Sequence, residues 1–353
     1  MMSEHTPLNN NSIHDAVAEW CSDNDSAFSK YGAIGDWNTS SITSTKDLFI
    51  NRVKFNNDIS RWDMSNVIDV SGMFSNATTF DQNIGQWNVS KATNMAGIFS
   101  DATSFNQYIG DWNVSNVECF DHMFSGASSF NQSIAKWDIS AARVVACMFC
   151  EAIVFNQDLS DWNVSNISDM SCMFFKATSF DQDIGRWDVV NVKSMRGMFH
   201  QAESFHQDIS AWDVINVTNF EKMFHRAKSF DVKCVEDWDM SSVKSMKYML
   251  SSQYDIDMQQ RRQGHHHHRH HLQQQQQQRG HQHDKSPHQK KANSPTRQLF
   301  TSSFHDGTTA VVVPGSVPTT STHNTNNVHA VHDVHHVAVH SRRQIGSCCC
   351  VIA

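Results

Sequence analysis

The sequence predicts an α/β solenoid, built from about nine coils of about 25 residues each. The main observation is the spacing of tryptophan: eight tryptophans follow one another at intervals of 25 residues, and a ninth follows after 26. A spacing this constant indicates one structural unit copied end to end. Periods of this size are typical of solenoids, in which each coil buries its apolar face against its neighbours. The repeating tryptophans are Trp37, Trp62, Trp87, Trp112, Trp137, Trp162, Trp187, Trp212 and Trp238.

One repeat, residues 62–86, predicts the elements of a coil. Its apolar residues fall on one side of a helix at steps of three and four: Val67, Val70, Met73, Phe74 and Ala77. Asn66 precedes them as a candidate N-cap. We therefore expect a helix over 66–77, then a loop, then a short strand from Ile84 to the next tryptophan.

Three further columns of residues keep the 25-residue register. Two are phenylalanine, and we expect them to stack in a continuous core. The third is glutamine preceded by Asn, Asp or His, whose side chains are expected to hydrogen-bond from coil to coil. The columns are Phe49 to Phe224, Phe55 to Phe230, and Gln82 to Gln207, each in steps of 25.

Composition divides the chain into three parts. Residues 1–27 form an N-terminal segment or cap with a net charge of −5, in which a short capping helix is expected over His14–Trp20. Residues 28–258 hold the repeats and carry −10. Residues 259–353 carry +7 and are rich in His, Gln, Ser and Thr, so we expect a disordered linker.

These charges limit the partners. The repeat region is acidic, which argues against nucleic-acid binding, whereas a basic tail suits an anionic membrane surface. No apolar run reaches the ~20 residues that span a bilayer, and the N-terminus does not resemble a secretory signal. We expect a monomer with no cofactor and with a protein partner.

The repeat resembles that of a known family. The run from Phe155 to Ala177, FNQDLSDWNVSNISDMSCMFFKA, is similar to the BspA-like leucine-rich-repeat surface proteins, whose 25-residue repeat also occurs in Mycoplasma-type lipoproteins. The resemblance covers about residues 28–258. It implies a right-handed, leucine-rich-repeat-like solenoid used for adhesion or protein binding, with no catalytic residues.

The residues on either side of each tryptophan form the candidate partner-binding face. Side chains at positions i and i+2 of an extended segment share one face. A basic residue before the tryptophan goes with Asp after it, and an acidic residue goes with Asn, which suggests that like charges are kept apart within each pair. The candidate residues are Arg61, Asp63, Asp111, Asn113, Lys136, Asp138, Asp161, Asn163, Arg186 and Asp188. The alternative is a solvated face with no partner.

A cluster on neighbouring coils carries metal-ligating residue types. Cys147 and Cys150 are three residues apart, Cys172 lies one repeat later than Cys147, and His122 one repeat earlier. The four side chains are a candidate zinc site, and Cys147 with Cys172 is a candidate disulfide. Four separate side chains without a metal are the simplest interpretation.

The end of the chain carries a candidate lipid anchor. Cys350-Val351-Ile352-Ala353 fits the prenylation motif, with Cys350 as the prenylated residue and Cys348 and Cys349 placed for palmitoylation. The leading hypothesis is a non-catalytic protein-binding module, lipid-anchored to the cytoplasmic face of a membrane. The alternatives are a cell-surface adhesion protein and a His-rich metal-binding protein that uses residues 265–271. No nucleophile–base pair or phosphate loop indicates an enzyme.

Overall fold

The computed structural model describes residues 8–250. Its helices are α1 (Ser12–Ser22) and α2 (Asn24–Tyr31), with the short 3-10 helices η1 (Ile34–Asp36) and η2 (Val232–Val235). Between η1 and η2 the described chain has no helix, and its only β-structure consists of isolated bridges. The lipidation residues, the His-rich tract and the predicted 259–353 linker lie outside the described residues.

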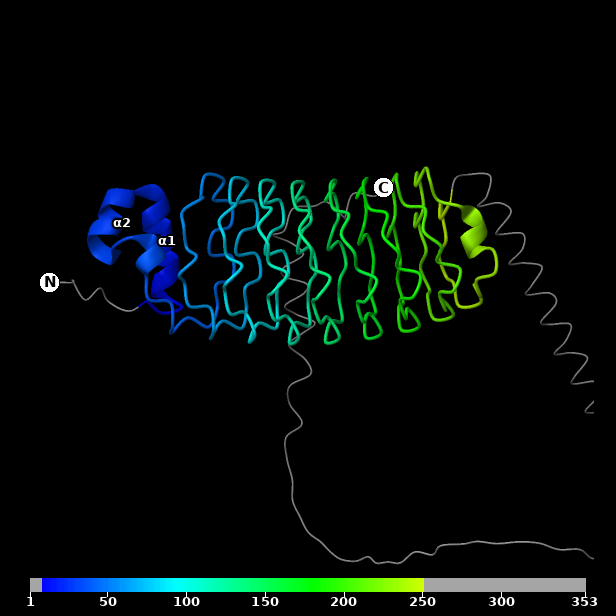
Figure 1. The fold of residues 1–353 in the computed structure, drawn as a ribbon, viewed down its shortest axis with the longest axis horizontal. Coiled ribbons are helices and arrows are strands. Elements are labelled where there is room, and N and C mark those ends of the chain that lie inside the picture. The colour runs from blue at the N-terminus through cyan, green and yellow to red at the C-terminus, as the bar shows by residue number, and fades with distance from the viewer. Residues whose placement is uncertain (1–7, 251–353) are drawn as a thin grey trace, which may run out of the picture. The chain divides into compact units, whose positions relative to one another are not determined.

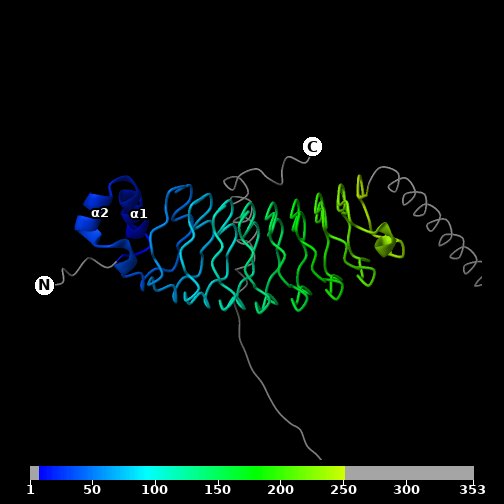
Figure 2. The ribbon, with the colours of Figure 1, turned by 45° about the horizontal axis from the view of Figure 1, so that its top comes forward.

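From Trp37 onward the chain forms successive coils, each running from one repeat tryptophan to the next (Figures 1 and 2). Eight parallel bridges, one per coil junction, join nine coils in register: Ser44 to Asp69, Asp69 to Asn94, Asn94 to Cys119, Cys119 to Val144, Val144 to Asp169, Asp169 to Ser194, Ser194 to Asn219, and Asn219 to Ser245. Parallel pairing with a 25-residue offset places equivalent residues of neighbouring coils side by side. The chain is a repeat protein in structure as well as in sequence.

The segment predicted to be helical, 66–77, is instead a run of turns. The amides of Gly72 and Phe74 donate to carbonyls of the next coil at 2.8 and 2.9 Å, whereas the amide of Met73 donates to the carbonyl three residues back. An α-helix directs every amide to the carbonyl four residues back, so this alternation excludes it. Successive three-residue turns direct a side chain into the core about every three to four residues, which is nearly the period of an α-helix. This explains why the apolar spacing of the sequence resembled that of a helix.

The predicted strand before each tryptophan is also absent. Residues 84–89 contain a turn and otherwise have no regular secondary structure. The bridge residue of this coil, Asp69, lies instead inside the segment predicted to be helical. Asn66 does not cap a helix. Its side-chain amide donates to the carbonyl of Ser40 in the preceding coil at 2.9 Å. The order within a coil is therefore turn, bridge and turns.

Left-handed residues occur at two fixed positions of each coil, where they reverse the backbone between turns. Glycine occupies only some of these positions, such as Gly72 at φ 63° and Gly126 at φ 71°. The first position is held by Asp47, Gly72, Gly97, His122, Cys147, Cys172, Gly197, Lys222 and Tyr248. The second is held by Asn51, Asn76, Asp101, Gly126, Glu151, Lys176, Gln201 and Arg226. Non-glycine residues there carry backbone strain that the packing of neighbouring coils must offset.

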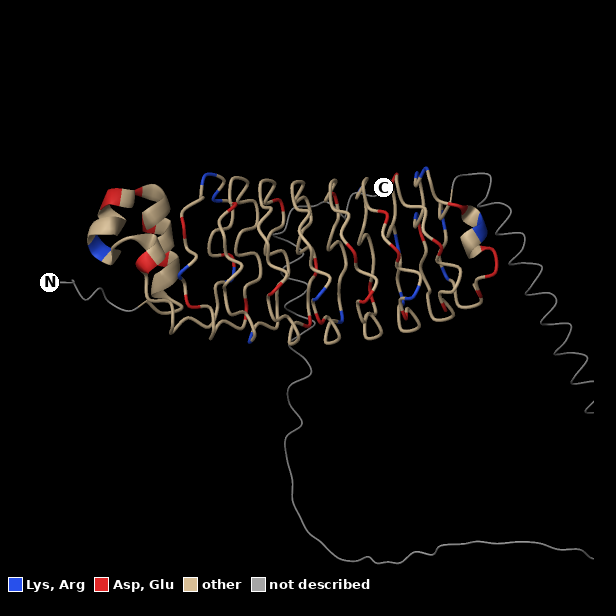
Figure 3. Ribbon diagram, in the orientation of Figure 1, with Lys and Arg blue, Asp and Glu red and all other residues tan. Residues whose placement is uncertain are grey.

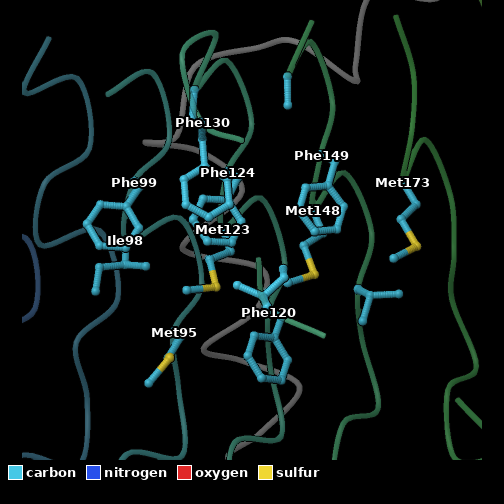
Figure 4. Close-up of a cluster of buried hydrophobic side chains, with 14 of the residues drawn as sticks. Met95, Ile98, Phe99, Phe120, Met123, Phe124, Phe130, Met148, Phe149 and Met173 are labelled. Atoms are coloured by element: carbon cyan, nitrogen blue, oxygen red, sulfur yellow. The ribbon is translucent and has the colours of Figure 1, made fainter. Parts of the chain in front are cut away.

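The two predicted phenylalanine columns are confirmed. Phe124 and Phe149 stack at 5.6 Å between ring centroids, and within one coil Phe124 and Phe130 stack at 4.0 Å. Methionines such as Met123 and Met148 fill the space beside these rings (Figure 4). The rings are almost completely buried, so the core runs continuously from coil to coil.

Each tryptophan combines burial with a hydrogen bond between coils. The Nε1 of Trp137 donates to the carbonyl of Ile109 at 3.1 Å, and Trp162 bonds in the same way to Ile134 at 3.3 Å. Every repeat tryptophan from Trp62 to Trp238 makes the equivalent bond. Phenylalanine carries no donor, so this bond explains why the column is tryptophan.

The glutamine column hydrogen-bonds between coils, as expected, but the partner is the residue that precedes the glutamine of the preceding coil. Oδ1 of Asn131 accepts from the backbone amide of Asn156 at 2.9 Å and from Nε2 of Gln157 at 3.0 Å. The same pair of bonds recurs from Asn56 to Asp181.

Replacing Asn131 by alanine should therefore lower the free energy of unfolding by about 1–2 kcal/mol, because two partly buried donors lose their acceptor. Chemical denaturation followed by tryptophan fluorescence measures the change. The control is Asn131→Asp, which keeps the acceptor and matches Asp81 and Asp181 in the same column. An equal loss of stability in Asn131→Ala and Asn131→Asp would contradict the contribution of these hydrogen bonds between coils.

The N-terminal cap is helical, as predicted, and lies against the first coil (Figure 1). The rings of Trp20 in α1 and Trp37 meet edge to face at 5.8 Å. Oδ1 of Asn10 accepts from the amide of Thr43 at 2.9 Å, taking the place of the carbonyl that a preceding coil would supply. The predicted boundary between residues 27 and 28 falls inside α2, so this cap extends to Tyr31.

Candidate partner-binding strip

The candidate partner-binding residues lie in one strip along the coils. The strip consists of the exposed residues four before, one before and one after each repeat tryptophan. All ten predicted residues are exposed, while the tryptophans between them are buried. The phenol of Tyr108, four before Trp112, donates to the carboxylate of Asp111, one before it, at 3.0 Å. Both positions therefore belong to one surface.

Ion pairs in the strip run between coils. Arg61 pairs with Asp36 at 2.5 Å and Lys136 with Asp111 at 3.1 Å. The sequence grouped these bases with Asp63 and Asp138, across the tryptophan of their own coil. Stacking in register instead brings the residue 25 positions earlier within reach. Both pairs are well exposed to water, so they contribute little to stability.

The residue after each tryptophan has a structural role that the sequence did not reveal. Its side-chain oxygen accepts from the backbone amide two residues later, as in Asp138 to Ser140 at 3.0 Å and Asn163 to Ser165 at 3.1 Å. This is an Asx turn, for which Asn and Asp are equally suited. Asp63, Asn113 and Asp188 make the same bond. Turn formation explains why only Asn or Asp occurs here; the choice between them still follows the charge of the residue before the tryptophan.

These turn bonds also keep the strip ionised. The hydroxyl of Ser140, followed by its backbone amide, lowers the pKa of Asp138 below its usual value. The pKa of Asp158 is lowered by the backbone amide of Ser160 and then by its hydroxyl. Fixed carboxylates at defined heights along the stack are a suitable surface for a cationic partner.

Charge is unevenly distributed along the strip. In the coils from Trp162 to Trp238 the strip exposes eight aspartates and one base, Arg186. The aspartates are Asp158, Asp161, Asp183, Asp188, Asp208, Asp213, Asp237 and Asp239. Figure 3 shows acidic residues along the described coils. The strip of these later coils is therefore the most acidic part of the predicted binding face.

The candidate metal-binding residues do not form one group. Cys147, Cys150 and Cys172 pack with Phe175 in a small buried cluster. His122 instead has Nδ1 3.2 Å from Oδ2 of Asp121. Across residues 8–250 no three His, Cys, Asp or Glu side chains are arranged to hold a metal ion. The three cysteines pack together, but Cys172 is not disulfide-bonded, so the predicted disulfide between Cys147 and Cys172 is wrong.

Two histidines that the sequence analysis did not single out lie beside this cluster. His200 stacks edge to face on Phe175 at 5.0 Å and on His225 at 5.2 Å. The Nδ1 atoms of both histidines are buried without a hydrogen-bond partner among the described residues. Burial, and then the charges of His225 and Lys222, lower the pKa of His200 from 6.5 to about 4. The 25-residue spacing of His200 and His225 was the feature of the sequence that could have identified this pair.

This buried histidine predicts acid sensitivity. Because the folded pKa lies below the unfolded value, the unfolded state binds the proton more tightly. Stability is therefore full above pH 6.5 and falls as the pH drops toward about 4, by an amount on the order of 2 kcal/mol. Thermal unfolding between pH 7 and 4 measures it. His200→Phe, which copies Phe175, should flatten this part of the profile, and an unchanged slope would contradict the assignment.

One family model matches the chain, in four overlapping stretches: residues 19–128, 86–171, 108–189 and 157–262. The family is described as "Mycoplasma protein of unknown function, DUF285". No curated protein and no solved structure shows significant similarity to the chain. None of the helices described in residues 8–250 is long and apolar enough to cross a membrane. Together the four stretches run from residue 19 to 262, more than half of the chain, and the chain belongs to the DUF285 repeat family.

Proposed function

We propose that the repeats form a solenoid of the BspA-like, leucine-rich-repeat-like kind that binds a protein partner without catalysis. The observation that supports this most directly is the strip, in which exposed polar side chains recur at fixed heights on a rigid stack. Extended surfaces of this kind are what repeat proteins use to bind other proteins. The binding face includes the ten residues named from the sequence.

The partner of this proposal presents basic residues to the later coils. Eight aspartates against one arginine between Asp158 and Asp239 produce a negative potential that attracts cations and disfavours acidic surfaces. Lys and Arg side chains spaced along an extended segment would meet carboxylates on successive coils.

Neutralising the strip tests this. The variant carries Asp161→Asn and Asp213→Asn. Asp213 makes an Asx turn with the amide of Ile215, and asparagine keeps that turn, as Asn163 shows. The control carries Glu118→Gln and Glu203→Gln, which remove the same charge from exposed ion pairs elsewhere. Proximity labelling in cells should show basic neighbours of the parent and control that the strip variant loses. Identical neighbours for all three chains would reject the strip as the binding face.

The proposal places the module at the cytoplasmic face of a membrane through its last residues. This rests on the Cys350-Val351-Ile352-Ala353 motif, on Cys348 and Cys349, and on the basic charge of 259–353. One prenyl chain anchors only marginally, so a second lipid or the basic segment is needed for stable attachment.

Replacing Cys350 by serine is expected to abolish prenyl labelling and release the protein from membranes, because the thiol is the attachment atom. The measurement is fractionation and farnesyl labelling of N-terminally tagged parent and variant, with Cys234→Ser as the control cysteine change. If the parent is unlabelled and fractionates like the variant, the proposal of a lipid anchor at Cys350 is wrong. Protection of the repeats from protease on intact cells separates this location from a cell-surface adhesion protein.

A further inference from the structure

One corner of the later coils is basic, although the repeat region as a whole is acidic. The corner consists of the residues 9, 10, 13 and 14 positions after each repeat tryptophan, which include the two left-handed positions. In the five coils from Trp37 to Trp137 it holds four acids and one base. In the four coils from Trp162 onward, which we call the basic corner, it holds one acid, Glu221, and five bases: Lys176, Arg196, Lys222, Arg226 and Lys247.

Two buried histidines lie at the centre of the basic corner. The ring centroid of His200 is 5.2 Å from that of His225, which in turn lies 6.2 Å from the ring of Tyr248 in the last coil. His200 is only 7% exposed, and Nδ1 of each histidine is buried without a hydrogen-bond partner among residues 8–250. Buried polar groups are almost always hydrogen-bonded. Two unsatisfied nitrogens side by side therefore point to a ligand that supplies the acceptor.

Positive charge surrounds these histidines. Lys222 is 8% exposed, and its backbone, like that of Arg226, is left-handed, with φ 59° and 61°. Lysine is rarely buried, and a non-glycine residue is strained in this conformation, which points to a role for the charge of Lys222. After burial and His225, the charges of Lys222, Arg226 and Lys176 lower the pKa of His200 to about 4. The same charges attract an anion.

The carboxylates nearby leave the basic corner with an excess of positive charge. Glu151 lies 2.6 Å from Lys176, and Glu221 lies 4.0 Å from Arg196. Arg226 makes no ion pair with any residue of the described range 8–250. Five bases therefore stand against these two acids, and an anion can bind without displacing either carboxylate.

We propose that the basic corner is a binding site for a phosphate monoester. A neutral imidazole that carries its proton on Nδ1 donates one hydrogen bond, while Lys222 and Arg226 supply charged donors. Donors on several side chains of two coils suit the three oxygens of a tetrahedral phosphate better than the two of a planar carboxylate. Nucleic acid would need bases along a longer surface, because its phosphates follow an extended backbone. The site is separate from the partner-binding strip.

An ion can reach the buried nitrogens without opening the stack of coils. Arg226, Lys247 and Tyr248 are exposed, and Nζ of Lys247 lies 4.9 Å from the ring centroid of Tyr248. Exposed side chains change rotamer within nanoseconds. Their movement uncovers the histidines, and the phosphate then gives each Nδ1 the acceptor that it lacks among the described residues.

The test measures binding of inorganic phosphate to the full chain by isothermal titration calorimetry, with chloride at equal ionic strength as the reference. At ten times its dissociation constant, phosphate should raise the melting temperature by about 3–6 °C. The variants copy residues that other coils place at the same positions: Lys222→Gly copies Gly197, His200→Phe copies Phe175, and Arg226→Gln copies Gln201. Each should weaken phosphate binding by about 10- to 100-fold, because one hydrogen bond to a charged group is lost.

Two controls change the later coils outside the basic corner. Lys193→Thr removes an exposed base and copies Thr218, and His206→Asn removes a histidine and copies Asn156. Both should bind phosphate like the parent, and tryptophan fluorescence establishes that every variant is folded. The absence of phosphate binding to the parent, or equal affinity of Lys222→Gly and the controls, would overturn the proposal.

A second measurement identifies the source of the phosphate. Parent and Lys222→Gly are sedimented with phosphatidylcholine vesicles that contain or lack phosphatidylinositol 4-phosphate. Retention of the parent that Lys222→Gly loses supports the site with a lipid headgroup as its ligand. Phosphate binding without such retention supports the site with a soluble monoester as its ligand.

Discussion

Replacing Trp137 by alanine is expected to lower the free energy of unfolding by about 3–5 kcal/mol, the largest single effect in the chain. The side chain is only 3% exposed and lies between the coils on either side of it. Its loss leaves a cavity in the continuous core and deprives the carbonyl of Ile109 of its donor. Because each coil is stabilised only by its neighbours, this loss should split the stack into two independently melting parts.

Calorimetry and denaturant titration measure this effect, and Trp137→Phe separates its causes. Phenylalanine keeps most of the apolar area but has no donor, so the variant should lose about 1–2 kcal/mol. Trp20→Ala is the positional control, since it changes a buried tryptophan of the cap and should not divide the repeats. A single cooperative transition at the parent's midpoint for Trp137→Ala would contradict the stacked core.

Replacing Gly126 by alanine is expected to lower the free energy of unfolding by about 2–4 kcal/mol. Gly126 has φ 71°, which disfavours any side chain, and an added Cβ would collide with the Asp101 carboxylate of the preceding coil, whose Cγ lies 3.2 Å from that point. Thermal denaturation measures the loss.

A second substitution distinguishes the collision from the backbone strain. Asp101→Ala in the Gly126→Ala background removes the carboxylate but keeps a side chain at the left-handed position 101. It should recover part of the stability if the collision matters, whereas strain at residue 126 alone would leave the stability unrecovered. Gln201→Gly, at the same position of another coil with φ 61°, should stabilise the protein by up to about 1 kcal/mol. If Gly126→Ala left the free energy of unfolding unchanged, the coil would have to accommodate the added Cβ without strain, which would contradict this prediction.

The period and the core were predictable because the sequence repeats them. The spacing of tryptophan and phenylalanine gave the number of coils and the stacking of Phe124 on Phe149. The ends were partly predictable as well, since the apolar pattern of α1 marked a capping helix. The matched family confirms that the chain is a repeat protein, while the resemblance to BspA-like proteins stays a prediction.

The backbone within each coil could not be predicted from the same pattern. The spacing of Val70, Met73 and Ala77 fits a helix and equally fits three-residue turns, and apolar periodicity alone does not distinguish them. The deciding information is where each amide finds its acceptor. For Gly72 and Phe74 the acceptor lies in the next coil, beyond the reach of a local pattern.

The candidate sites show the same division. Exposure of the ten strip residues followed from their position beside a buried tryptophan. The ion-pair partners of Arg61 and Lys136 did not, because stacking in register brings Asp36 and Asp111 closer than residues of the same coil. The convergence of Cys147, Cys150 and Cys172 in one buried cluster likewise depended on side-chain directions that only the turns define.

The sequence by itself determined that this protein is a repeat of 25 residues with an aromatic core, because identical units must bury identical faces. Only the tertiary structure decided that each unit is a run of turns with left-handed corners, capped by α1 and α2. The physical reason is that the hydrogen bonds and contacts that hold each coil in shape are made to its neighbours, and a single repeat considered alone has no means to specify them.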